Sequence, residues 1–233
     1  MTPLIIAHRT CPLDAPENSL AGMRLAAELG ADAIEIDLRL SLDQRPFLMH
    51  DWTMKRTAGW PLPLELTPSP LVRKQRLADG SSVPSLDEAF EALSPAQMLA
   101  VDVKSPWAVL PLMRQIKRRA LEKRVLVWCT SALAVRYAVH AAPQVEVAYL
   151  RDLTDPAANR AFIAKAQRLG ARAISADWRA IDAQFIAAAN ARGLRVYSFD
   201  KGQDLAPEKL TSGLAGLITD RIAEARSAVK NFG

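Results

Sequence analysis

Two nine-residue stretches of the chain are nearly alike: LGADAIEID at residues 29–37 and LGARAISAD at residues 169–177. They share the Leu, the Gly, two Ala, an Ile and the final Asp. In each stretch a helical pattern stops at a glycine, and a short apolar run that ends in Asp follows. A looser third copy, LAGLITD, occupies residues 214–220. Recurrence of helix, glycine and strand predicts a barrel of repeated βα units.

Short apolar runs with the composition of buried strands recur along the whole chain. They are Leu4–Ala7, Ala33–Leu40, Phe47–Met49, Met98–Val103, Val125–Cys129, Val145–Leu150, Ala171–Ala176, Leu194–Phe199 and Leu214–Thr219. Helical stretches with recognisable ends separate most of them. The expected helix starts are Asn18 or Ser19, the capping box of Ser85 and Glu88, Asp155 with Pro156, Asp182, and the segment after Asp220. Alternation of this kind predicts a parallel sheet.

The run at Phe47–Met49 is one strand more than an eight-stranded barrel needs. Only Ser41–Pro46 separates it from the preceding strand, and a parallel connection takes about a dozen residues, so we expect an antiparallel excursion. The prediction is a (β/α)8 TIM barrel with a short insertion after the second strand. A doubly wound open sheet is the alternative. It would usually carry a glycine-rich loop after the first strand, but the first glycine there is Gly22.

We expect residues 1–233 to form one barrel domain, with residues 41–84 as a short hairpin or flap within it. Four prolines at positions 61, 63, 68 and 70 would stiffen that flap. No apolar run approaches the ~18 residues that a membrane span requires. The N-terminal residues do not have the pattern of a signal peptide. Two cysteines, Cys11 and Cys129, are compatible with a reducing compartment, so the expected location is cytoplasmic.

The net charge of +5 is spread thinly, which argues against a nucleic-acid partner. Polar side chains instead gather at the predicted strand ends, where a TIM barrel carries its chemistry. These are His8 and Arg9, Glu35 and Asp37, His50 and Asp51, Asp102 and Lys104, and Thr219 and Asp220. Residues two apart in a strand share a face, so Ile34, Ile36, Val101 and Val103 should face the helices.

Three carboxylates on neighbouring inward positions would repel one another in a low-dielectric interior. A hard divalent cation, Mg²⁺ or Ca²⁺, would relieve that repulsion, so Glu35, Asp37 and Asp102 are candidate metal ligands. The alternatives are ordinary ion pairs, with Arg9 or Arg39 on Glu35 and Asp37, and Lys104 on Asp102.

His8 and His50 suit acid–base catalysis, with one imidazole taking a proton and the other donating one. Arg9 and Lys104 could stabilise a phosphoryl transition state. This set of side chains favours an enzyme that hydrolyses a small-molecule phosphodiester. Cys11 is better explained as a small core residue than as a nucleophile.

These motifs together resemble those of the glycerophosphodiester phosphodiesterases. The family is marked by His-Arg, Glu-x-Asp and His-Asp, which here are His8-Arg9, Glu35-Ile36-Asp37 and His50-Asp51. Further similar segments are Pro16-Glu17-Asn18, Gly30-Ala31-Asp32, Val83–Glu88, Val101–Lys104 and Ile218–Arg221.

The resemblance implies a TIM barrel that holds a divalent cation on Glu35, Asp37 and Asp102. It implies that His8 and His50 are the acid–base pair, with Arg9 and Lys104 on the phosphate. The products would be glycerol 3-phosphate and an alcohol such as choline or ethanolamine, which suggests a role in lipid and glycerol metabolism.

The chain departs from the family pattern at several positions. Thr10 replaces a glycine, Asp102 replaces a glutamate, and Ser198-Phe199-Asp200-Lys201 lacks the usual Asn. Candidate walls of the substrate site are Phe199, Trp52 and Trp178, for which ordinary packing is the alternative. Two other functions stay open: a lysophospholipase D, or a catalytically weak barrel that binds phosphodiesters. His140, near a helix end, is not expected to take part.

Overall fold

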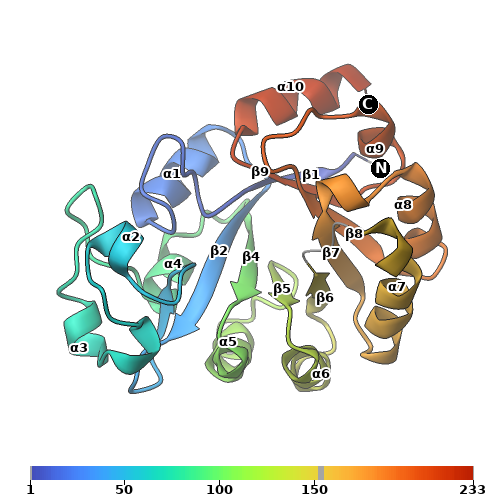
Figure 1. The fold of residues 1–233 in the computed structure, drawn as a ribbon. Coiled ribbons are helices and arrows are strands. Elements are labelled where there is room, and N and C mark those ends of the chain that lie inside the picture. Colours follow the sequence, from blue (N-terminus) through green and yellow to red (C-terminus); the bar gives the residue numbers. More distant parts are fainter. Residues whose placement is uncertain (1, 152–154, 233) are drawn as a thin grey trace.

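The computed structural model describes residues 2–151 and 155–232, and Figure 1 shows their fold. Within these residues one sheet has the strand order β1-β9-β8-β7-β6-β5-β4-β2-β3, and β1 also pairs with β2. The last pairing closes eight parallel strands into a barrel, which confirms the predicted TIM barrel and rules out the open sheet. The strands are β1 (Leu4–Ala7), β2 (Ala33–Leu40), β3 (Pro46–Leu48), β4 (Met98–Val103), β5 (Val125–Cys129), β6 (Glu146–Arg151), β7 (Ala173–Asp177), β8 (Arg195–Phe199) and β9 (Gly216–Thr219).

Helices lie between the strands and cover the outside of the barrel (Figure 1). The α-helices are α1 (Leu20–Glu28), α2 (Lys55–Ala58), α3 (Ser69–Val72), α4 (Leu86–Ala92), α5 (Val109–Arg118), α6 (Ala132–Ala141), α7 (Asn159–Arg168), α8 (Ala183–Asn190), α9 (Pro207–Thr211) and α10 (Ile222–Phe232). The 3₁₀ helices are η1 (Leu64–Leu66), η2 (Pro106–Ala108), η3 (Pro156–Ala158) and η4 (Trp178–Ala180).

The predicted helix starts agree with the structure. Ser19 caps α1 by accepting a 2.9 Å hydrogen bond from the Gly22 amide. Ser85 and Glu88 form the capping box of α4, and Asp182 caps α8. The helix expected after Asp155 begins with the 3₁₀ turn η3 before α7 follows.

Strands β1, β2, β4 and β5 have the predicted boundaries, and the boundaries of the other five differ from the prediction by one or two residues. The expected strand at Ala171–Ala176 is β7, which begins at Ala173. Ala171 instead completes the turn after Gly170, because its amide donates to the Ala166 carbonyl at the end of α7. A turn of this type satisfies carbonyl groups that the helix end leaves without partners.

Strand β3 is the predicted excursion, since it pairs antiparallel with β2 in the register Leu38 opposite Leu48. The chain from β3 to α4 contains α2, η1 and α3 and lies beside the barrel (Figure 1). It has a small core of its own, formed by Phe47, Met49, Met54, Leu64, Val72, Leu77 and Val83. This core holds the segment after His50 against the rim of the barrel.

The strand residues alternate between two separate apolar layers. Ile34, Ile36, Val101 and Val103 belong to the layer shared with the helices, as predicted. The barrel interior is lined by five alanines, by Ile6, Leu126 and Ile218, and by two large aromatic residues, Trp128 and Tyr197, whose rings lie 5.5 Å apart. Because these two rings fill the centre of the barrel, the space for a ligand lies above them, at the carboxyl ends of the strands.

Candidate active site

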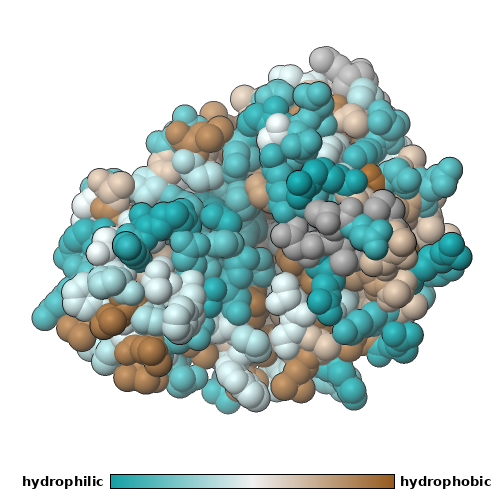
Figure 2. Space-filling model, viewed as in Figure 1, coloured by the Kyte–Doolittle hydropathy of each residue, from teal (hydrophilic) through white to brown (hydrophobic). Residues whose placement is uncertain are grey.

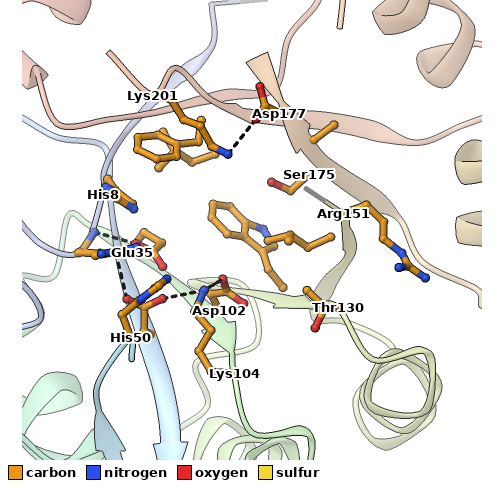
Figure 3. Close-up of a pocket in the computed structure, with 17 residues that line it drawn as sticks. His8, Glu35, His50, Asp102, Lys104, Thr130, Arg151, Ser175, Asp177 and Lys201 are labelled. Carbon is orange, nitrogen blue, oxygen red and sulfur yellow. Dashed lines mark hydrogen bonds and ion pairs between the residues drawn. The ribbon is translucent and has the colours of Figure 1, made fainter. Parts of the chain in front are cut away.

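A cavity of about 290 Å³ opens at the carboxyl ends of the barrel strands (Figure 3). Its lining includes the predicted acid–base, phosphate-binding and metal-binding residues together with one predicted aromatic wall: His8, Arg9, Glu35, Asp37, His50, Asp102, Lys104 and Phe199. These side chains come from β2, β4 and β8 and from the segments that directly follow β1, β3 and β4. The closed barrel therefore brings together residues that lie up to 191 positions apart (8 to 199) in the sequence.

We call the three carboxylates of Glu35, Asp37 and Asp102 the acidic wall. Each of its three carboxylates is buried and offers an oxygen within 4.8 Å of the other two. Asp37 and Asp102 are register partners on adjacent strands, and Glu35 lies two residues before Asp37 on the same face of β2. Figure 3 shows Glu35, Asp102 and Lys104 gathered on one side of the cavity.

Two basic side chains, those of Lys104 and Arg9, lie against the acidic wall. Lys104 Nζ is 3.0 Å from Asp37 Oδ1 and 2.5 Å from Asp102 Oδ2. Arg9 Nε is 3.5 Å from Asp37 Oδ2, and the Arg9 amide donates to Glu35 Oε2 at 2.7 Å. The ion pairs expected for Arg9 and Lys104 thus form within the cluster. Arg39 does not take part, because it pairs with Glu65 and donates to the His50 carbonyl.

Burial and mutual repulsion separate the acidities of the three carboxyl groups. Burial raises the pKa of Glu35 well above its usual range, and the charges of Asp37 and Asp102 add to the rise. Burial likewise raises the pKa of Asp102. Burial also opposes ionisation of Asp37, but Lys104, His50 and Arg9 together hold its pKa below the usual range. Despite burial, the surrounding carboxylates raise the pKa of Lys104.

The acidic wall suits a divalent cation. Asp102 Oδ1 is buried and makes no hydrogen bond to any described residue, so one ligand oxygen is uncommitted. The donors are all hard carboxylate oxygens, which Mg²⁺ and Ca²⁺ prefer. A cation would also offset the excess of three carboxylates over Lys104 and Arg9.

Each pocket histidine is held by a carboxylate at Nδ1. His8 Nδ1 is 2.7 Å from Asp220 Oδ1, and His50 Nδ1 is 2.7 Å from Asp51 Oδ1. A neutral imidazole that donates from Nδ1 has a free lone pair on Nε2, where it can accept a proton. His8 also packs against the Phe199 ring, with 4.0 Å between ring centroids. Both rings therefore have a defined orientation in the cavity.

A chain of ion pairs behind His50 was not predicted. Asp51 accepts a 2.7 Å hydrogen bond from Arg56 Nε in α2, and the other two Arg56 nitrogens each lie 2.7 Å from a Glu17 oxygen. Glu17 is also 3.3 Å from Arg9. The chain joins the insertion to the loop after β1. The sequence has no periodic signal for it, because Glu17 and Arg56 are 39 positions apart.

The departure at Thr10 has a structural explanation. Thr10 is fully buried at a positive φ of 76°, which glycine adopts more readily than threonine. A Cβ atom on Gly22 would lie only 2.2 Å from Thr10 Oγ1. The missing side chain at Gly22 therefore creates the space that Thr10 occupies.

The cavity lining also contains residues from β5 to β8 and the segments after these strands that the sequence analysis missed. We call Trp128, Thr130, Ser175 and Lys201 the donor wall, since each carries an N–H or O–H group and all four line the cavity. Asp177 lies beside them and is 2.8 Å from Lys201 Nζ (Figure 3). The strand periodicity could have identified Ser175 and Asp177, which correspond to Glu35 and Asp37 in the repeated stretch.

Of the three aromatic residues expected to form walls, Phe199 lines the cavity and the other two do not. Trp178 packs in η4, where its Nε1 donates to the Asp204 carbonyl, and Trp52 lies outside the cavity with 56% of its surface exposed. For Trp178 the packing alternative is therefore correct. Cys11 is also a core residue, and burial raises the pKa of its thiol to about 11. His140 lies at the end of α6, as expected.

The fold and the cavity together define a TIM barrel with an acidic, histidine-containing site at the carboxyl ends of its strands. The glycerophosphoryl diester phosphodiesterase family model matches residues 8–224, and the chain belongs to this family. The chain is 26% identical over 237 aligned residues to the glycerophosphodiester phosphodiesterase of Caldanaerobacter subterraneus, covering 94% of this chain and 95% of that protein. Family and relatives identify the protein as a phosphoric diester hydrolase.

Solved structures share the fold. A putative glycerophosphodiester phosphodiesterase from Galdieria sulphuraria has a TM-score of 0.86 at 19% identity over 99% of both chains. A phosphodiesterase from Oleispira antarctica, solved with the product sn-glycerol-3-phosphate, has a TM-score of 0.82 at 22% identity over 98% of this chain and 97% of that one. Among the described residues, no helix combines the length and apolar character needed to cross a membrane.

Proposed function

We propose that this protein hydrolyses glycerophosphodiesters to glycerol 3-phosphate and an alcohol, in a metal-dependent reaction with His8 and His50 as the acid–base pair. The observation that carries the proposal is that two histidines, each held at Nδ1 by a carboxylate, line one cavity with three buried carboxylates. Such a reaction belongs to lipid and glycerol metabolism. Two free, buried cysteines are compatible with the proposed cytoplasmic location.

Glu35, Asp37 and Asp102 would hold the cation, Mg²⁺ or Ca²⁺. When bound, it would supply positive charge that stabilises the phosphoryl transition state. Arg9 and Lys104, whose side chains also line the cavity, would contact the phosphate oxygens. Phe199 would contact the substrate and keep the His8 ring in place.

The two histidines would move the protons. One neutral imidazole would take the proton of the glycerol 2-hydroxyl as its oxygen attacks phosphorus. The other, as imidazolium, would protonate the alcohol oxygen as its bond to phosphorus breaks. Water would then open the cyclic phosphate with the proton transfers reversed. We propose both residues as the pair without assigning which one acts first.

The test is release of glycerol 3-phosphate from several glycerophosphodiesters with Mg²⁺, with Ca²⁺ and after treatment with EDTA. His8→Ala and His50→Ala should each lower kcat/KM by about 10²–10⁴-fold. His140→Ala is the matched control and should keep parent activity, because His140 is exposed at the end of α6. Activity that is indifferent to EDTA and to His8→Ala would overturn the proposal. Binding without any turnover would instead support the catalytically weak barrel.

Lysophospholipids are a second candidate substrate class, because large apolar side chains are exposed on the insertion. Trp52, Leu62 and Leu66 have 56%, 49% and 61% of their surface exposed. Trp52 follows Asp51 directly, and backbone hydrogen bonds join Trp52 to Leu64 and Leu62 to Met54. Figure 2 shows hydrophobic surface over the region of α3. Cleavage of lysophospholipids in the same activity assay would support this class.

A further inference from the structure

Trp128 brings to the cavity a buried hydrogen-bond donor that the proposed reaction has not yet used. The residue is only 3% exposed, and its Nε1 makes no hydrogen bond within the described part of the chain. An indole N–H can only donate, so its partner must be an acceptor. A buried donor without an acceptor is unfavourable. Because Trp128 lines the cavity, a ligand with an acceptor atom can supply the missing hydrogen bond.

The strand register places this donor beside the acidic wall. Trp128 in β5 is the register partner of Asp102 in β4, and neighbouring strands lie only about 4.8 Å apart. Both residues line the cavity. Asp102 Oδ1 is likewise buried and without a hydrogen bond among the described residues. An unpartnered donor and an unpartnered acceptor are therefore neighbours at the cavity, and neither satisfies the other.

The groups around Trp128 favour an anionic oxygen as the acceptor. Lys104 Nζ lies 2.5 Å from Asp102 Oδ2 and also lines the cavity. A divalent cation on the acidic wall would need further oxygen ligands beyond the three carboxylates. A ligand oxygen at this position therefore meets the cation, the ammonium group and the indole. A hydroxyl oxygen has only two lone pairs for these three contacts, whereas a phosphate oxygen has a full negative charge and can make all of them.

We propose that Trp128 Nε1 donates to a nonbridging oxygen of the substrate phosphate, which makes Trp128 a third phosphate-binding residue beside Arg9 and Lys104. The indole holds the phosphate next to Asp102 from the side of β5. Since every glycerophosphodiester contains this phosphate, the hydrogen bond forms whichever alcohol leaves. The inference rests on the proposed glycerophosphodiesterase activity and adds a residue to its phosphate site.

The first experiment observes the indole N–H directly in the full-length protein labelled with ¹⁵N. Each of the five tryptophans gives one indole signal, and single Trp→Phe changes at the other four positions assign the signal of Trp128. Titration with inorganic phosphate in the presence of Mg²⁺ should move the Trp128 proton to lower field, because a hydrogen bond to an anionic oxygen deshields it. Trp107, which is 61% exposed and outside the cavity lining, is the internal control, and its signal should stay in place.

The second experiment uses Trp128→Phe, which keeps an aromatic ring but removes the donor. It should weaken phosphate binding about 10- to 100-fold, the value of one hydrogen bond to a charged group. It should lower kcat/KM for glycerophosphoglycerol and for glycerophosphocholine by the same factor and leave the Mg²⁺ affinity close to that of the parent. Trp107→Phe is the matched control and should match the parent in all of these measurements. If thermal unfolding shows that Trp128→Phe fails to fold, the spectrum of the parent decides the question.

The outcomes that overturn the inference are distinct. A Trp128 signal that phosphate does not move would overturn it, as would a signal that glycerol moves and phosphate does not. A loss in Trp128→Phe that is confined to one of the two substrates would mean that the indole contacts the leaving alcohol instead. Absence of turnover for every glycerophosphodiester would overturn the proposed function, whereas the phosphate titration would still show whether Trp128 contacts an anionic oxygen.

Discussion

The two copies of the repeated stretch have the same backbone but place their aspartates among different side chains. Gly30 and Gly170 both end a helix with a positive φ, 80° and 76°. In each copy the glycine amide and the following alanine amide donate to the last turn of the helix. The strands that follow, β2 and β7, each carry an aspartate at the cavity.

The difference lies in what surrounds each aspartate. Asp37 shares the acidic wall with two more carboxylates, and Lys104 and Arg9 leave that group one negative charge in excess. Asp177 instead pairs with the basic side chains of Arg179 and Lys201. The same βα unit can therefore place its aspartate in a cluster of carboxylates or beside basic side chains, depending on its neighbours in the barrel.

In a test of this comparison, the largest effect is expected from Asp102→Asn in the acidic wall. The change removes one charge from the candidate cation site, so we expect kcat/KM to fall about 10²–10³-fold. Calorimetric titration with Mg²⁺ should show weaker binding. Asp79→Asn, in an exposed turn, is the matched control and should match the parent. Unchanged Mg²⁺ affinity in Asp102→Asn would contradict a metal role for Asp102.

A second variant at the same position tests the site through an expected increase in Mg²⁺ affinity. Asp102→Glu introduces the longer side chain that the resemblance to the family implies at this position, so it should bind Mg²⁺ more tightly than the parent. Calorimetric titration with Mg²⁺ is again the measurement. Weaker binding would mean that the neighbouring backbone is adjusted to the shorter ligand.

A smaller effect is expected from Arg56→Ala, which breaks the ion-pair chain behind His50. Loss of the Arg56 contacts frees Asp51, so the His50 ring is less well oriented, and kcat should fall about tenfold. KM should change little, because Arg56 does not line the cavity. Lys55→Ala, at the neighbouring position of α2, is the control. Equal losses in both variants would indicate a general effect on the insertion instead.

The smallest effect is expected from Asp177→Asn, and it concerns stability. Hydrogen bonds from Arg179 and Lys201 hold the pKa of Asp177 below its usual range, despite opposing burial. Ionised Asp177 therefore stabilises the fold above about pH 4, and this contribution is lost as the pH falls through the folded-state pKa. Asp177→Asn should lower the free energy of unfolding by about 1 kcal/mol at pH 7.

Denaturant unfolding at several pH values checks this prediction. The difference between Asp177→Asn and the parent should shrink as the pH falls below about 4. Glu122→Gln, outside the cavity, is the control and should show no such change. A difference that stays constant down to pH 2 would contradict an ionic role for Asp177.

Local patterns in the sequence were sufficient for much of the fold. Ser19, Ser85 and Asp182 act on amides within three residues, so their capping roles can be read from the sequence. The short link Ser41–Pro46 excluded a parallel connection for β3. Residue parity placed Glu35 with Asp37, and Asp102 with Lys104, on the inner face.

The sequence by itself determined the repeated βα units, the polar strand ends and the residues of the acidic wall, because each depends on spacing along one segment. Only the tertiary structure decided that Trp128, Ser175 and Lys201 form one wall, that Glu17 and Arg56 support His50, and that Trp178 packs away from the cavity. These contacts join strands and loops far apart in the chain. Closure of the barrel sets their distances, and no local pattern encodes that closure.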